Sequence, residues 1–254
     1  MMKIWNNLRR LGVTAGALIA LGQPAAATDC RRMDHDGQGY VLCTIQAEEE
    51  PRLGLWLNDA SGNKLNNFGN LHRVLSDGQA LAFAMNAGMF HSDYEPVGLF
   101  RSDTEEHGRL ITAGGDGNFG LLPNGVFCTG GSRPYQVIES RSFAKERPQC
   151  RLATQSGPML VINGELHPRF LVNSDSRYIR NGVGVSPNGQ TAWFAISDHP
   201  VTFHQFGRLF RDGLGADNAL YFDGSISRLY APQVRRNDFG WPMGPIIGLV
   251  VDEG

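Results

Sequence analysis

Short segments suited to β-strands, each bounded by residues that favour tight turns, are the feature that most restricts how this chain can fold. Several are joined by Asn-Gly or Pro-Asn-Gly, which tolerate the positive φ of tight turns. The chain has 32 glycines, mostly in such turn-like clusters. This pattern predicts many short strands and argues against a helical bundle. The segments are YVLCTIQA, LGLWLND, ALAFAMN, GLLPNGVFC, GPMLVING, NGVGVS, TAWFAIS, ALYFD and IIGLVV.

The first 27 residues have the pattern of a secretory signal. Three basic residues precede an apolar stretch (11–21), which is followed by Ala25, Ala26 and Ala27. The apolar stretch is short for a membrane span. We therefore predict a signal peptide (1–27) cleaved after Ala27, one domain (28–254) without a transmembrane segment, and a secreted, periplasmic location.

Charge and composition restrict the class of partner. Apolar residues make up 41% of the chain and charged residues 19%, which is typical of a globular protein. Removal of the signal peptide takes away three positive charges and changes the net charge from −2 to −5. A mildly acidic protein without a basic run is a poor candidate for binding nucleic acid or an anionic membrane.

Four cysteines follow the predicted cleavage site, and an even number in an oxidising compartment suggests two disulfides. Three connectivities are open. We favour Cys30–Cys43 and Cys128–Cys150, because each closes a short local loop. Metal binding by these cysteines is a weaker alternative, since there is no CxxC motif.

One helix is expected, between two strands. The segment 201–215 has apolar residues at helical spacing, and Thr202 with Gln205 forms a capping box. A strand, a helix and a strand in this order usually place the two strands parallel. We therefore predict a mixed α/β (α+β) fold with strand-rich mixed sheets, hairpins, a βαβ unit and few helices.

The same unit brings charged residues to one sheet edge. Asp198 follows the first strand and Asp223 ends the second, so both are expected at the carboxyl edge, where ligands commonly bind. The turn 186–189 makes a hairpin that places Arg180 roughly opposite Ile196, at the same edge. Each has a structural alternative: the aspartates can begin turns, and the arginine can make a structural ion pair.

Six ordered motifs give the chain a resemblance to the phosphodiester glycosidase family. They are AMNAGMF (84–90), LPNGVF (122–127), TQSGPMLVINGE (154–165), RNGVGV (180–185), ISD (196–198) and YFDGSIS (221–227). Within the family the chain is most similar to a bacterial periplasmic group without an assigned function. The family often has several glycines after the aspartate, whereas here Gly224 alone precedes Ser225, which leaves less room for backbone to approach a phosphate.

The resemblance implies hydrolysis of a sugar-1-phosphodiester, such as an N-acetylglucosamine-1-phosphodiester, at the anomeric carbon. Asp223 would stabilise or attack the sugar, and Asp198 would act as a base. Arg180 would bind phosphate through its guanidinium. The remaining candidate substrate-binding residues, several of which can equally serve turns, are Asn86, Gly88, Ser156, Gly157, Gly224, Ser225 and Ser227.

Two other functions remain open. A metal-dependent phosphodiesterase would break the P–O bond, since Asp and Asn around a phosphodiester could bind a divalent metal. A periplasmic glycan-binding or envelope module would keep the fold without turnover. No organic cofactor is indicated: the glycine-rich segment 112–120 lacks the spacing of a P-loop or a dinucleotide fingerprint.

Overall fold

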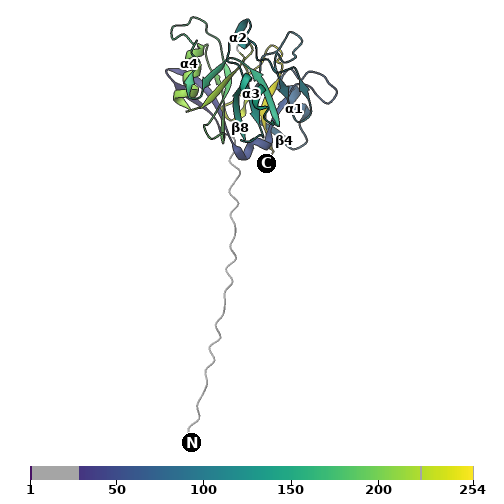
Figure 1. Ribbon diagram of the computed structural model, residues 1–254. Coiled ribbons are helices and arrows are strands. Elements are labelled where there is room, and N and C mark those ends of the chain that lie inside the picture. Colours follow the sequence, from purple (N-terminus) through teal and green to yellow (C-terminus); the bar gives the residue numbers. More distant parts are fainter. Residues whose placement is uncertain (2–28, 224, 254) are drawn as a thin grey trace.

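The computed structural model describes Met1 and residues 29–223 and 225–253. The predicted signal peptide and Gly224 lie outside the described residues. The described chain forms three antiparallel sheets with a few short helices (Figure 1). This architecture confirms the strand-rich α+β class predicted from the turn pattern.

The largest sheet has seven strands in the order β1-β2-β13-β12-β14-β10-β11. All of its described strand pairs are antiparallel. Its strands are β1 (Asp29–His35), β2 (Gln38–Gln46), β10 (Met159–Ile162), β11 (Glu165–Leu166), β12 (Asn181–Val185), β13 (Thr191–Ser197) and β14 (Asn218–Asp223).

Two five-stranded sheets complete the fold. The second sheet has the order β16-β15-β4-β17-β3 and the third β6-β5-β9-β7-β8. The second comprises β3 (Leu53–Trp56), β4 (Gln79–Asn86), β15 (Leu229–Ala231), β16 (Arg236–Asn237) and β17 (Ile246–Asp252). The third comprises β5 (Phe100–Arg101), β6 (Glu106–His107), β7 (Gly125–Thr129), β8 (Tyr135–Glu139) and β9 (Leu152–Ser156).

The helices are short and lie between strands. The predicted helix forms as α4, and its capping box is present: the Thr202 hydroxyl accepts from the Gln205 N–H (3.1 Å), and Gln205 Oε1 accepts from the Thr202 N–H (3.0 Å). The α-helices are α1 (Phe68–Val74), α2 (Gly117–Gly120), α3 (Ser140–Glu146) and α4 (Phe203–Arg208). A π-helical turn, η2 (Leu209–Gly213), extends α4, and the 3-10 helices are η1 (Ala47–Arg52) and η3 (Pro232–Val234).

The predicted βαβ unit is present with a strand inserted in its centre. Strands β13 and β14 run in the same direction because both pair antiparallel with β12, which lies between them. Helix α4 connects β13 to β14 in sequence. The carboxyl ends of the two strands therefore lie at one sheet edge, but two strand spacings apart, roughly 10 Å.

The hairpin register differs from the prediction by one residue. Asn181, and not Arg180, pairs with Ile196. Arg180 lies opposite Ser197, whose N–H donates to the Arg180 carbonyl (2.9 Å). The reason is the turn: Ser186 donates to Thr191 across it, so its centre falls half a residue later than the predicted one.

One apolar core is shared by all three sheets. The ring of Phe194 in β13 lies 5.1 Å from Phe83 in β4, 5.6 Å from Phe127 in β7 and 6.5 Å from Phe222 in β14, measured between centroids. All four rings are buried. Smaller clusters lie beneath α4, α1 and α3 on the outer faces of the sheets.

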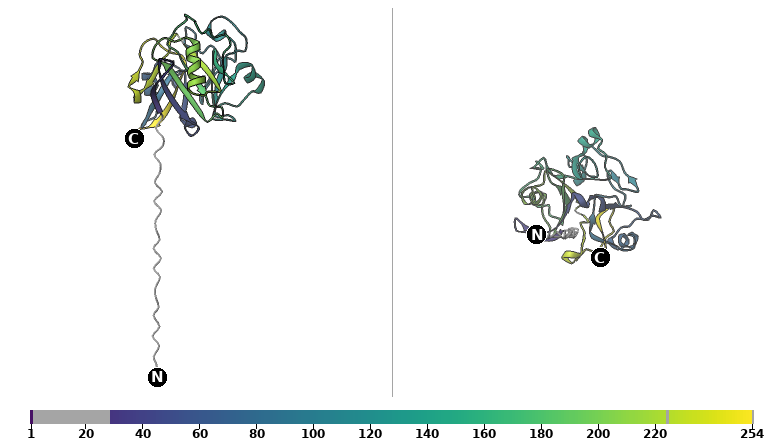
Figure 2. Two further views of the ribbon diagram at one scale, coloured as in Figure 1. Left: turned by 90° about the vertical axis from the view of Figure 1, so that its left-hand side faces the viewer. Right: turned by 90° about the horizontal axis from the view of Figure 1, so that it is seen from below.

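Both predicted disulfides are formed. Cys30–Cys43 joins directly paired residues of β1 and β2, and Cys128–Cys150 links β7 to the segment before β9. Figures 1 and 2 show the C-terminus at one end of the molecule and α2 among loops at the other. Among the described residues, no helix has the length and apolar character needed to cross a membrane.

The shared core predicts a large loss of stability for Phe194→Ala. Removing a ring that contacts all three sheets leaves a cavity, so we expect the free energy of unfolding to fall by about 3–5 kcal/mol. Urea denaturation measures this change. Phe239→Ala is the matched control: this ring is 84% exposed, and its loss should change stability by no more than about 0.5 kcal/mol. Equal effects of the two substitutions would contradict the shared core.

Candidate active site

Four polar residues meet where strands of all three sheets begin or end. Asn86 ends β4, Ser156 ends β9, Asn181 begins β12 and Asp223 ends β14. Each is at least nine-tenths buried. Three of them were predicted as site residues from the sequence; Asn181 was not.

The side-chain amides of Asn86 and Asn181 form a buried pair that joins the second sheet to the largest one. Asn181 Nδ2 donates to the Asn86 carbonyl (2.8 Å) and to Asn86 Oδ1 (3.1 Å). Asn86 Nδ2 lies 3.4 Å from Asn181 Oδ1. Both residues are fully buried. The pair therefore satisfies polar groups that would be costly to leave alone in a core.

The same amide holds the backbone of Asp223. Asn181 Oδ1 accepts from the Asp223 N–H (3.2 Å) and from the Ser227 hydroxyl (3.3 Å). The Ser227 hydroxyl also lies against the Asp223 carbonyl. The carboxylate accepts from the Ser225 N–H (2.9 Å), and the residue is 7% exposed. A mostly buried carboxylate is thus fixed in place by contacts at both ends of a short loop.

A β-bulge directly precedes Asp223 in β14. Asn181 pairs with Asp223 and Gly182 with Tyr221, so Phe222 is an extra residue between them. Bulges commonly re-aim a side chain next to an active site. The Ser156 hydroxyl donates to the Phe222 carbonyl (2.7 Å). Ser156, predicted to bind phosphate, therefore supports the bulge through its hydroxyl.

Gly88 and Gly157, two of the predicted substrate-binding residues, allow two loops to pass close to this centre. Gly88 has φ +144°, and a Cβ there would lie 3.1 Å from the Thr154 hydroxyl oxygen. A Cβ on Gly157 would lie 2.7 Å from Asn124 Cβ, closer than side chains tolerate. Both positions are thus explained by close packing around the strand ends.

Arg180 lies beneath the sheet edge and is fully buried. Its Nε donates to the Val201 carbonyl (2.9 Å), one Nη donates to the Ser176 carbonyl (3.2 Å), and the guanidinium stacks on the Phe203 ring at 3.6 Å. Burial lowers the pKa of Arg180 below its ordinary value. Its other Nη has no hydrogen-bond partner among the described residues. Because Arg180 is fully buried, direct contact with a phosphate would require its surroundings to move.

Asp198 lies in a separate cluster. Its carboxylate forms ion pairs with Arg236 (3.0 Å) and Arg32 (3.5 Å). It lies over β2, where a Cβ on Gly39 would be 2.9 Å from Asp198 Oδ2. Because β2 and β14 lie on opposite sides of β13, the carboxylate is directed away from Asp223. The structure therefore does not bring the two predicted catalytic aspartates together.

The sequence analysis missed two residues of this centre. Asn181 stands beside Arg180 in a quoted motif, and a polar residue at the start of an apolar strand was the available signal. Arg228 donates its peptide N–H to Asn86 Oδ1 (2.9 Å). Within the described residues, no group of three or more His, Cys, Asp or Glu side chains is arranged to hold a metal ion.

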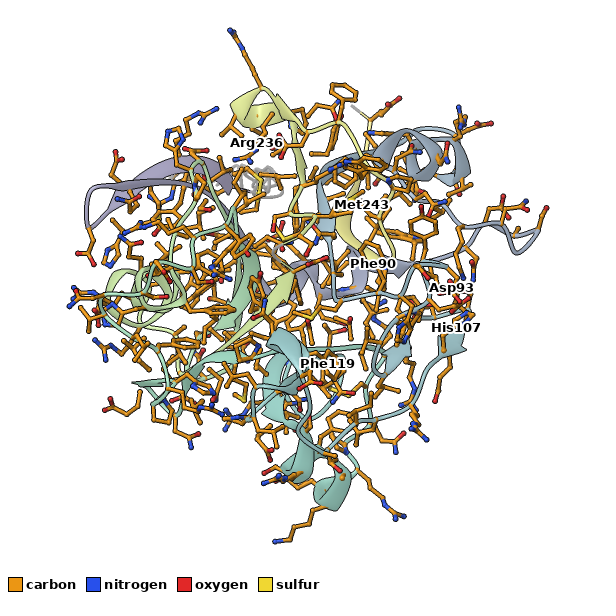
Figure 3. All side chains as sticks on the ribbon, turned by 90° about the horizontal axis from the view of Figure 1, so that it is seen from above. Phe90, Asp93, His107, Phe119, Arg236 and Met243 are labelled. Carbon is orange, nitrogen blue, oxygen red and sulfur yellow. A yellow bond between two sulfur atoms is a disulfide. The ribbon has the colours of Figure 1, made fainter. Side chains whose placement is uncertain are left out.

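Figure 3 shows the end of the molecule that carries α2. Phe90, Phe119 and Met243 lie toward the middle of this view, and Asp93, His107 and Arg236 lie nearer the periphery. Phe119 belongs to α2, and its carbonyl accepts from the buried Asn124 amide (3.1 Å). Phe90 packs against Gly244, where a Cβ would lie 2.6 Å from the Phe90 Cβ. Side chains from loops distant in sequence thus gather at this end.

Comparison with known proteins shows the family of the chain. The sequence profile of the phosphodiester glycosidase family matches residues 79–249. The chain is 32% identical to the uncharacterized protein YigE of Escherichia coli (strain K12), over 96% of this chain and 92% of that protein.

One solved structure, from zebrafish, has a similar fold. It is the catalytic domain of N-acetylglucosamine-1-phosphodiester alpha-N-acetylglucosaminidase, auto-inhibited by its pro-peptide. The TM-score is 0.58 at 11% identity, and the match covers 90% of this chain and 84% of the zebrafish chain. The fold is that of a phosphodiester glycosidase-like domain. The chain belongs to the phosphodiester glycosidase family.

The amide pair predicts that Asn181→Ala is strongly destabilising. The substitution leaves the Asp223 N–H and the Asn86 amide without their partner, and each buried polar group left alone costs about 1–3 kcal/mol. Urea denaturation should therefore show a lower free energy of unfolding. Asn173→Ala, at an exposed loop position, is the control and should change little. An Asn181 variant as stable as this control would show that the amide pair is dispensable.

Proposed function

We propose that the protein hydrolyses a sugar-1-phosphodiester at the anomeric carbon, releasing free sugar and a phosphomonoester. The observation that carries this proposal is Asp223, buried at the meeting point of three sheets, with its peptide N–H bound by Asn181 and its carboxylate bound by the Ser225 N–H. Membership of the family supports the reaction class. An N-acetylglucosamine-1-phosphodiester is the substrate we would test first.

The proposed chemistry centres on the sugar. The bond between the anomeric carbon and the phosphate oxygen breaks, and its electron pair leaves with the phosphate. Water supplies a hydroxyl group to the carbon, and its proton passes to phosphate or solvent. Asp223 stabilises the positive charge that develops on the ring, or attacks the anomeric carbon first. A phosphomonoester is a good leaving group, so little protonation is needed.

The other predicted site residues have separate roles in this proposal. Asn86 positions the centre through Asn181, and Ser227 holds the Asp223 loop. Ser225 is exposed beside the carboxylate and is the hydroxyl we propose to contact substrate. The phosphate contact of Arg180 stays a prediction, as does any contact by Gly224.

We also propose an extracytoplasmic location. The two disulfides support it, because such bonds persist in oxidising compartments. The N-terminal sequence pattern supports secretion and, in a bacterium, the periplasm.

Turnover of a nucleotide sugar that carries N-acetylglucosamine-1-phosphate tests the proposal, with free sugar separated from sugar phosphate. We expect free sugar from the wild type and at least about a hundredfold lower kcat for Asp223→Asn, because the lost charge no longer stabilises the transition state. Asp175→Asn, at an exposed loop position, is the control. Sugar phosphate as product, abolished by chelator, would instead indicate metal-dependent P–O cleavage. Binding without product would indicate a glycan-binding protein.

Asp198→Asn separates catalysis from ion pairing. Because the carboxylate is held by Arg236 and Arg32 and directed away from Asp223, we expect kcat to change less than about fivefold, or about 1 kcal/mol in activation free energy. Loss of the partly exposed ion pairs should lower the free energy of unfolding by about 1 kcal/mol or less. Steady-state kinetics beside Asp223→Asn measures this. A loss as large as that of Asp223→Asn would restore the general-base role predicted from the sequence.

A further inference from the structure

Arg228 combines an anchored backbone with an unoccupied guanidinium. Its peptide N–H is bound to Asn86 Oδ1 in the buried amide pair. Within residues 29–223 and 225–253, no hydrogen bond or ion pair of its side chain is found. Nearby Arg236, in contrast, binds both Asp198 and Asp238 at 3.0 Å. Arg228 is therefore a cation beside the site that no carboxylate neutralises by direct contact.

The side chain of Arg228 lines a cavity of about 340 Å³ between α1 and the strands β15 and β16. Aromatic rings and several polar groups form the rest of the wall. His72 and Tyr230 meet edge to face, with centroids 4.8 Å apart. Burial lowers the pKa of His72, so its ring adds aromatic surface and not a second cation near neutral pH. Phe68, Phe239, Asn237 and Asp238 also line the cavity. The Asp238 carboxylate is itself bound by Arg236 Nε (3.0 Å) and by the Leu229 N–H (2.9 Å).

The loop that carries Phe239 closes on the guanidinium. Gly240 has φ +132°, and a Cβ there would lie 2.6 Å from an Arg228 Nη. Only glycine readily permits this conformation and this approach. Phe239 itself is 84% exposed at the cavity. A ring left in solvent beside a cation, with no part in the core, is suited to contact a ligand.

We propose that this cavity binds the leaving group of the diester, a sugar phosphate: Arg228 binds its phosphate and the aromatic wall packs against its sugar ring. The inference rests on the proposed function, because it places the second half of the same substrate. A guanidinium matches phosphate oxygens through two parallel hydrogen bonds. Apolar walls with a few polar groups, here the amide of Asn237, are typical of small-ligand sites.

Calorimetric titration of the whole protein with glucose 6-phosphate and with inorganic phosphate tests the cavity without turnover. We expect Arg228→Gln to weaken both ligands about tenfold or more, because a hydrogen bond to a charged group is lost. Phe239→Ala should weaken glucose 6-phosphate severalfold and leave phosphate unchanged. The matched controls are Arg235→Gln, an exposed arginine of the same segment, and Leu171→Ala, an apolar side chain that is 70% exposed.

Each outcome decides the proposal. Failure of the wild type to bind glucose 6-phosphate, or equal affinities in Arg228→Gln and Arg235→Gln, would overturn it. If Phe239→Ala and Leu171→Ala bind glucose 6-phosphate with equal affinity, the proposed contact between the Phe239 ring and the sugar is wrong. Tighter binding of a nucleoside monophosphate than of glucose 6-phosphate would overturn the sugar assignment. Binding that follows the expected pattern, with no free sugar formed from any diester, would support the cavity and refute the proposed reaction.

Discussion

The buried amide pair of Asn86 and Asn181 is the interaction on which the site depends. It joins two sheets through hydrogen bonds between fully buried side chains. Its two oxygens also accept from the peptide N–H groups of Asp223 and Arg228. One hydrogen-bond network thus fixes the backbone of both the carboxylate and the cation. Because Asn86, Asn181 and Asp223 are buried, displacement of one would leave others unsatisfied, which makes the arrangement rigid.

The shared core gives this network a firm base. Phe194 contacts rings from the strands that lead toward Asn86 and Asp223, so the strand ends are held in one relative position. The bulge then adds one extra residue, Phe222, to β14 opposite β12. The Ser156 hydroxyl donates to the carbonyl of this extra residue. Catalytic groups held on strands in this way keep their geometry better than groups on free loops.

The sequence predicted what depends on local chemistry. The capping box of α4, the two local disulfides, the strands and the ordered family motifs follow from residues close together in the chain. The places of Asp198 and Arg180 depend on more distant relations. Insertion of β12 between β13 and β14 separates the two aspartates. The predicted turn centre was half a residue too early, so the prediction placed Arg180 where Asn181 pairs with both neighbouring strands. No local pattern reports either fact.

The loop after Asp223 explains how this chain departs from the glycine-rich pattern of its family. Ile226 packs against the cluster beneath α1, and Ser227 binds back to Asp223. Because the Ile226 side chain packs in this cluster, the loop has less freedom to bring its backbone amides to a phosphate than a loop of glycines has. The next residue, Arg228, has a fixed backbone and a guanidinium directed to the neighbouring cavity. In the binding mode that we propose, this side-chain cation takes the phosphate contact that glycines would otherwise permit, and the cavity wall contacts the group attached to that phosphate.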